Sequence, residues 1–79
     1  MTSSNGIIKS VQKSLKILKH IMNSPEEVSL SELEKKFGYN SSTIHHLLKT
    51  LMEEGFISQN KVTKKYDIGP EFLYYWFGS

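Results

Sequence analysis

The chain has 79 residues, which is enough for one small domain with a modest hydrophobic core. It contains no cysteine, so neither a disulfide nor a zinc–thiolate site can stabilise that core. All ten basic residues are lysines, and with eight acidic residues they leave a net charge of only +2. A charge this small does not by itself indicate a nucleic-acid partner.

The start of the chain, Met1–Gly6, is polar and lacks the basic and apolar segments of a secretory signal peptide. No apolar run is long enough to span a bilayer. We therefore expect a soluble intracellular protein with a flexible tail over residues 1–6, one domain over residues 7–69 and a C-terminal helix over residues 70–79.

Apolar side chains recur at helical spacing from Ile7 onward, which predicts a first helix. Ser10 is its candidate N-cap, and Asn23-Ser24-Pro25 ends it, because proline cannot continue a helix. Four lysines keep the opposite face polar. The apolar stripe consists of Ile7, Ile8, Val11, Leu15, Ile17, Leu18, Ile21 and Met22.

A second helix is predicted after a short extended segment at Val28. Ser29 or Ser31 begins it, since each is followed three residues later by a glutamate, as in a capping box. Gly38 ends it, because glycine readily adopts the left-handed conformation of a helix C-cap. The expected buried face consists of Leu30, Leu33 and Phe37.

Only Tyr39 and Asn40 separate Gly38 from a third helix, which we place over residues 40–54. Asn40 is its candidate N-cap. The inward face repeats at positions i, i+3, i+4 and i+7, and consists of Ile44, Leu47, Leu48 and Leu51.

The hydrophobic period then changes from helical to alternating, which predicts a β-hairpin. Its strands are expected at Phe56–Gln59 and Lys65–Ile68, with a polar loop between them, and Pro70 suits the first position of a last helix. This order of elements predicts a mainly α winged helix-turn-helix: a three-helix core, a short antiparallel sheet that forms the wing, and a C-terminal helix.

The outward face of the third helix is polar and carries no carboxylate before Glu53. Hydroxyl and imidazole groups can bind base edges in the major groove and phosphate oxygens. Any amphipathic helix has a polar outer face, but serine, threonine and histidine are weaker helix formers than the residues a merely solvated helix favours. The candidate DNA-binding residues are Ser41, Ser42, Thr43, His45, His46 and Lys49.

The hairpin offers a second candidate contact at residues 59–65. Lys61, Lys64 and Lys65 lie near its tip, where long cationic side chains can reach phosphates or a minor groove. The alternative is that these lysines only discourage aggregation through the edge of the sheet.

Five segments share a family pattern: Ser14–Leu18, Leu30–Gly38, Ser42–Leu48, Glu54–Ile57 and Tyr66–Pro70. In these segments the chain resembles the N-terminal domain of IclR-type transcriptional regulators. The resemblance covers residues 8–73. It implies a cytoplasmic, nucleoid-associated regulator that binds palindromic operators as a dimer, with the third helix in the major groove and the wing along the backbone.

Two features depart from that family. An arginine is usual where this chain has His46, so bidentate binding to guanine or phosphate is weakened or abolished. Family members also continue into an effector-binding domain that this chain does not contain. The chain is therefore either the DNA-binding part of a longer regulator or a small regulator that acts alone.

Neither a metal site nor catalysis is indicated. His45 and His46 are adjacent, so on a helix they point about 100° apart and cannot chelate one metal together. No nucleophile elbow or glycine-rich phosphate loop is present. We therefore expect no cofactor, no bound metal and no enzymatic activity.

The C-terminal segment Phe72–Phe77 is rich in aromatic residues. Part of it is expected to cover the core, and the remainder is more apolar surface than a monomer usually exposes. One hypothesis is therefore a homodimer through Phe72, Tyr74, Tyr75 and Phe77, with Ile17 or Ile21 of the first helix.

The main competing function is a winged helix that binds another protein and no DNA. Such a surface needs apolar anchors on the outward face of the third helix. The candidate residues on that face are serine, threonine, histidine and lysine, and none of them is an apolar anchor.

Overall fold

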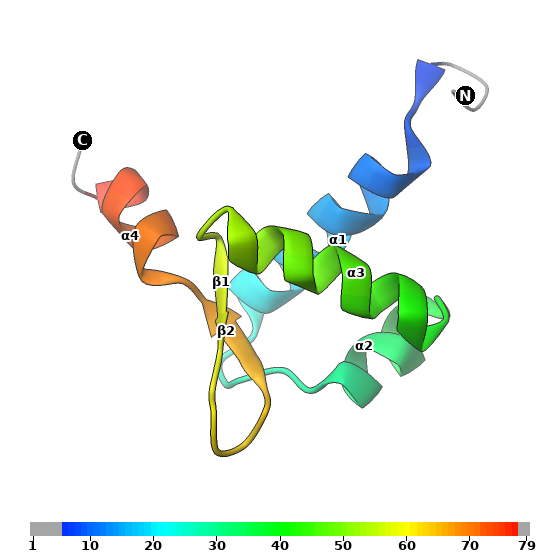
Figure 1. The fold of residues 1–79 in the computed structure, drawn as a ribbon. Coiled ribbons are helices and arrows are strands. Elements are labelled where there is room, and N and C mark those ends of the chain that lie inside the picture. The colour runs from blue at the N-terminus through cyan, green and yellow to red at the C-terminus, as the bar shows by residue number, and fades with distance from the viewer. Residues whose placement is uncertain (1–5, 78–79) are drawn as a thin grey trace.

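The computed structural model describes residues 6–77, and the side chains of residues 6–75. Three helices are followed by a hairpin and a fourth helix (Figure 1). This architecture confirms the predicted fold class of a mainly α winged helix-turn-helix. The elements are α1 (Lys9–Asn23), α2 (Leu30–Phe37), α3 (Ser41–Glu53), β1 (Ile57–Gln59), β2 (Tyr66–Ile68) and α4 (Pro70–Phe77).

One hydrophobic core joins α1, α2, α3, the segment before α2 and both strands. In α1 and α3 the buried residues recur at helical spacing, so that one face of each helix points inward. Burial of these side chains is the main stabilising contribution to a domain of this size. The buried residues are Ile17, Leu18, Ile21, Val28, Leu33, Ile44, Leu48, Leu51, Ile57 and Tyr66.

Helix α1 differs from its prediction at its start. It begins at Lys9, and the N-cap position is Ile8, whose side chain makes no capping hydrogen bond. Ser10 lies inside the helix, and its assignment as N-cap was wrong. Of the expected tail, residues 1–5 lie outside the described residues.

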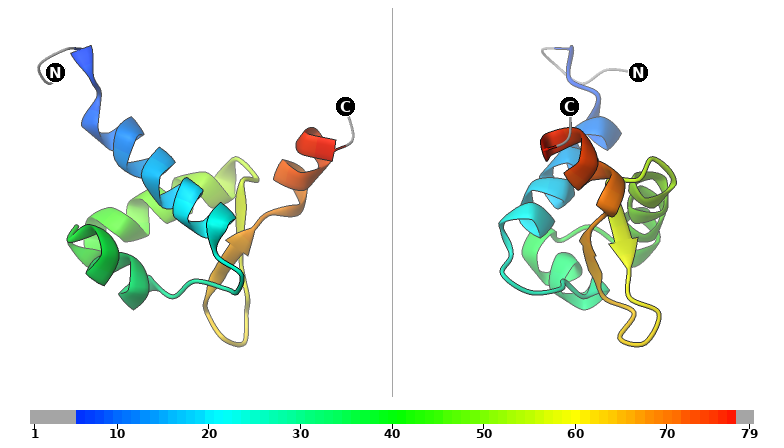
Figure 2. Two further views of the ribbon diagram at one scale, coloured as in Figure 1. Left: turned by 180° about the vertical axis from the view of Figure 1, so that it is seen from behind. Right: turned by 90° about the vertical axis from the view of Figure 1, so that its left-hand side faces the viewer.

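The apolar stripe of α1 is buried only in its C-terminal half. Ile17 and Ile21 are 0% and 1% exposed, whereas Val11 and Leu15 are 51% and 50% exposed. The first turns of the helix extend beyond the rest of the domain (Figure 2). The expectation that Ile17 or Ile21 takes part in a dimer contact was therefore wrong, because both side chains are enclosed in the core.

Side-chain caps set the boundaries of α2 and α3. Ser29, rather than Ser31, caps α2: its Oγ accepts a hydrogen bond from the backbone N–H three residues later, at 3.0 Å. Gly38 ends α2 in the left-handed conformation, with φ of 73°. Asn40 caps α3 through a bond of 2.8 Å to the backbone N–H three residues later. These caps confirm the predicted turn between the two helices.

Strands β1 and β2 pair in antiparallel fashion, with Ile57 opposite Ile68. Val28 extends this sheet by an isolated bridge, in which it exchanges two backbone hydrogen bonds of 2.8 Å with Tyr66. The predicted extended segment at Val28 is thus confirmed. The strand pair next to the loop is thus held both by the pairing of β1 with β2 and by the segment before α2.

Helix α4 follows β2 directly and extends away from the domain (Figure 2). Its Phe72 ring lies 5.5 Å from the ring of Phe56, between centroids, so this residue packs on the domain as expected. Tyr74 and Tyr75 are each 66% exposed. The side chains of Trp76 and Phe77, which the sequence placed on the same helix, lie outside the described part of the chain.

Across residues 6–77, every helix is too short or too polar to cross a membrane.

Candidate nucleic-acid interface

Helix α3 crosses the side of the domain seen in Figure 1, with α1 behind it. Ile44 and Leu48 are completely buried, so the orientation of the helix about its own axis is determined by the core. The same orientation turns the other side of α3 toward solvent. Five of the six residues predicted there are exposed, namely Ser41, Ser42, His45, His46 and Lys49.

Thr43, the sixth predicted residue of α3, is only partly exposed. Its backbone N–H donates to the Asn40 cap at 2.8 Å. Thr43 therefore lies where the cap joins the first turn, at the border between the exposed side and the core.

The start of α3 favours anions. Its first turn holds no acidic residue, and the first backbone N–H groups of a helix point toward solvent with the positive end of the helix dipole. The two carboxylates of this region, Glu53 and Glu54, lie at the other end of the helix. A phosphate approaching the Ser41–Ser42 end would meet donors without a nearby negative charge.

The predicted wing lysines are all exposed. Lys64 has a φ of 66°, in the left-handed region, so the loop turns sharply at this residue. The turn is closed by Asn60, whose Oδ1 accepts hydrogen bonds from the backbone N–H groups of Val62 and Thr63 at 2.8 and 3.0 Å. The loop that carries Lys61 and Lys64 is thus built by its own hydrogen bonds.

Asn60 was not among the predicted functional residues. An asparagine that begins a polar loop and bonds to the backbone two residues later is a known turn former, so its signal was present in the sequence. The partner of its amide group, Glu27, lies far away in the sequence and gave no such signal.

A row of ring contacts links α1 to the turn before α3. The Phe37 ring meets the His20 ring edge-on at 5.9 Å and stacks on Tyr39 at 5.5 Å, between centroids. Lys13 Nζ lies 4.9 Å from the centroid of the Tyr39 ring, a cation–π contact. No local pattern in the sequence indicated this row, which joins α1 to the end of α2 and the turn before α3.

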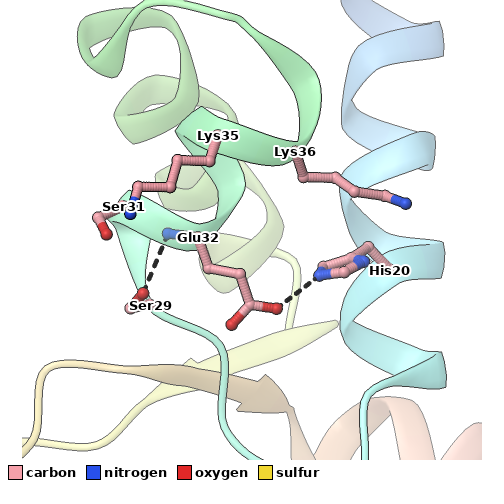
Figure 3. Close-up of a pocket in the computed structure, with 6 residues that line it drawn as sticks. All are labelled: His20, Ser29, Ser31, Glu32, Lys35 and Lys36. Atoms are coloured by element: carbon pink, nitrogen blue, oxygen red, sulfur yellow. Dashed lines mark hydrogen bonds and ion pairs between the residues drawn. The ribbon is translucent and has the colours of Figure 1, made fainter.

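The same part of the molecule contains an open surface hollow between α1 and α2 (Figure 3). Within it His20 Nε2 lies 2.8 Å from Glu32 Oε2. Lys36 extends toward α1, whereas Lys35 turns away from it. The pair of His20 and Glu32 joins the two helices across the hollow.

The two histidines of α3 lie side by side, with ring centroids 6.1 Å apart. Within the described residues, no three side chains of the metal-binding types are close enough to share an ion.

A helix with a polar exposed side, free of carboxylates until its last residue, packs with two other helices beside a lysine-bearing hairpin. This arrangement defines the class of winged helix-turn-helix DNA-binding domains. The family model described as "IclR helix-turn-helix domain" matches residues 10–61. The chain therefore belongs to the IclR helix-turn-helix family, and the resemblance noted in its sequence is confirmed.

Two curated relatives are transcriptional regulators of Escherichia coli strain K12. The HTH-type transcriptional regulator XynR is 40% identical over 67 residues, which are 85% of this chain and 27% of XynR. The transcriptional repressor IclR is 39% identical over 54 residues, which are 68% of this chain and 20% of that protein. The chain thus spans about a quarter of the length of the curated relatives it matches.

Solved structures show the same fold. HmgR of Pseudomonas aeruginosa is 32% identical, with a TM-score of 0.74 over 84% of this chain and 27% of that one. The IclR protein of Thermotoga maritima is 31% identical, with a TM-score of 0.77 over 85% of this chain and 27% of that one. In each case the similarity is to about one quarter of a longer chain.

Proposed function

We propose that this domain binds double-stranded DNA with sequence preference and thereby regulates transcription. In this proposal α3 enters the major groove and the loop between β1 and β2 lies along the phosphate backbone. The observation that carries it is the exposed side of α3, which is polar and free of carboxylates until the helix ends. The names of its relatives as transcriptional regulators support the same reading.

The exposed residues of α3 divide by position. In this proposal Ser41, Ser42 and Thr43, in the first turn, contact phosphate through hydroxyl and backbone N–H groups. His45, His46 and Lys49 follow along the helix, and we expect them to contact base edges. The imidazole of His46 can direct only one of its two ring nitrogens at a base edge, whereas an arginine would make a bidentate contact. We therefore expect a single copy of the domain to bind DNA with modest affinity.

We infer that α3 binds DNA rather than another protein. A winged helix that binds another protein through α3 would need exposed aromatic or aliphatic anchors there. The exposed positions of α3 hold serine, histidine, lysine and threonine instead, with a glutamate only at its last residue. The composition of this face therefore favours DNA over a protein partner, and failure to bind any duplex would remove that preference.

We also propose that the domain forms a homodimer. Tyr74 and Tyr75 of α4, together with Val11 and Leu15 of α1, expose apolar surface that a second copy would cover. Helix α4 and the N-terminal half of α1 extend from the same side of the domain, opposite the wing (Figures 1 and 2). Phe72 and Phe77 remain members of the proposed contact as the sequence suggested.

The test begins with selection of bound duplexes from a random pool, followed by affinity measurements over a range of salt concentrations. Each phosphate contact contributes about −0.9 to the slope of log affinity against log salt. Lys64→Gln and Lys65→Gln should each make the slope shallower by about that amount. His45→Ala should change the selected sequence instead.

Lys16→Gln is the matched control, because Lys16 is an exposed lysine of α1, behind α3. It removes one positive charge without touching the proposed interface, and should keep the slope of the unaltered protein. Absence of enriched sequences, together with binding that does not depend on salt, would overturn the proposed function.

A further inference from the structure

Glu27 lies in the segment between α1 and α2, and its carboxylate contacts the wing loop. One oxygen, Oε2, accepts a hydrogen bond from Asn60 Nδ2 at 3.0 Å. The other, Oε1, accepts a hydrogen bond from Thr63 Oγ1 at 2.9 Å. Both carboxylate oxygens are therefore bound by side chains that lie 33 and 36 positions further along the chain.

The two donors are the side chains that shape the loop. The Asn60 amide donates to Glu27 and its oxygen closes the turn, as described above. The Thr63 hydroxyl donates to Glu27 and accepts a hydrogen bond from the Lys65 backbone N–H at 3.2 Å. Each side chain thus links the carboxylate to the backbone that carries the lysines.

A hairpin of two short strands is not rigid by itself, and a ribbon of this kind is only marginally stable in isolation. The loop end of its strand ladder, where Tyr66 pairs with Gln59, is held by the bridge between Val28 and Tyr66. Glu27, the residue before Val28, adds a second attachment within the loop itself, through Asn60 and Thr63. Two attachments fix the direction in which the loop points, whereas one would leave it free to bend. Figure 2 shows this segment beside the hairpin.

We propose that Glu27 is a positioning residue for DNA binding: it anchors Asn60 and Thr63 and so holds the wing lysines in place to contact phosphates. The inference rests on the proposed function of the wing. Electrostatics alone makes the opposite prediction, because a carboxylate beside a phosphate-binding loop repels DNA and its removal would strengthen binding. The sign of the effect therefore separates the two explanations.

The test compares Glu27→Ala with Glu26→Ala, a matched variant that removes the same charge from the neighbouring exposed residue. Affinity for a selected duplex is measured over a range of salt concentrations. Glu27→Ala should bind about threefold to tenfold more weakly, with a slope shallower by about 0.9 for each phosphate that the wing no longer binds. Glu26→Ala should bind as well as the unaltered protein or slightly better. Equal or tighter binding by Glu27→Ala with an unchanged slope would overturn the inference.

Thr63→Val separates position from charge, because it removes the hydroxyl that donates to Glu27 and accepts from the Lys65 N–H, and leaves every charge in place. It should weaken binding and reduce the slope in the same direction as Glu27→Ala. If Thr63→Val binds normally while Glu27→Ala does not, the effect of Glu27 does not pass through this hydrogen bond and the inference is wrong.

Amide hydrogen exchange gives a readout that needs no DNA. In Glu27→Ala the Val62 and Thr63 amides, which donate to Asn60, should exchange at least about tenfold faster, because their acceptor is no longer held. The amides of Val28 and Tyr66 should keep their exchange rates, which also verifies that the variant is folded. Unchanged exchange of the loop amides would overturn the anchoring role of Glu27. This outcome is distinct from failure of the unaltered domain to bind any duplex, which would overturn the proposed function.

Discussion

Tyr66 connects three parts of this domain through one residue. Its backbone exchanges two hydrogen bonds with Val28, and its ring, 4% exposed, belongs to the core. Its hydroxyl accepts a hydrogen bond of 3.4 Å from Gln59 Nε2. Burial raises the pKa of the Tyr66 phenol above its ordinary value of 10.0, since the charged form is shielded from water.

The raised pKa of Tyr66 predicts a loss of stability in alkali. The folded state holds the phenolic proton more strongly than the unfolded state does. Its contribution to the free energy of unfolding is therefore complete below about pH 10 and is lost as the pH rises through the raised pKa. Urea unfolding between pH 7 and 11 should show a steeper decline above about pH 10 for the unaltered protein than for Tyr66→Phe. Tyr74→Phe, at an exposed ring, should follow the unaltered protein, and parallel curves for all three would contradict the prediction.

Two glycines delimit elements for different reasons. Gly38 ends α2 with φ of 73°, and a methyl group added there would meet no heavy atom within 4 Å. Gly69 joins β2 to α4, and an added Cβ would lie 2.6 Å from the carbonyl oxygen of Gly55 and 3.1 Å from backbone atoms of Ile57. The first position restricts only the backbone conformation, whereas the second requires close approach of two backbone segments.

These glycines give a prediction at the scale of the element junction. Gly38→Ala should lower the free energy of unfolding by about 1 kcal/mol, the cost of a left-handed alanine. Gly69→Ala should cost more, about 1–3 kcal/mol, because backbone atoms must move to admit the methyl group. Urea unfolding of both variants measures the difference. A Gly69→Ala variant at least as stable as Gly38→Ala would show that the backbone at Gly69 moves easily away from Gly55 and Ile57.

At the scale of the whole molecule, exposed apolar residues of α1 and α4 lie away from the wing (Figure 1). The exposed part of α1 and helix α4 extend on the side opposite the wing (Figure 1). A dimer formed through that side would leave both copies of α3 and both wings accessible. Two half-sites on DNA would then be bound at a separation set by the dimer.

The proposed dimer predicts a concentration-dependent mass. Equilibrium sedimentation at micromolar to millimolar concentrations should show association of the unaltered domain, and Leu15→Lys should weaken it because a charge would be buried at the contact. Val62→Lys is the control: Val62 is 89% exposed on the wing loop, and its replacement should leave association unchanged. A monomer at every concentration would contradict the proposal for residues 1–79.

Much of the fold could be predicted from local patterns. The caps Ser29 and Asn40 act on backbone N–H groups three residues away, so their signals lie within a few positions of the sequence. The spacing of Ile44, Leu48 and Leu51 likewise fixes which side of α3 is buried and which side is exposed. The order of elements and the candidate residues of α3 followed from these short-range rules.

Other features depended on parts of the chain that are far apart in the sequence. The helical spacing of apolar residues assigns Val11, Leu15, Ile17 and Ile21 of α1 to the same apolar stripe. Only Ile17 and Ile21 are buried in the core. The contact of Glu27 with the wing joins residues more than thirty positions apart, for which no local pattern exists. Short-range interactions thus determined the helices, their caps and the polar side of α3. Tertiary packing decided which apolar surface remained exposed and what holds the wing, because burial and long-range hydrogen bonds depend on distances that only the folded chain defines.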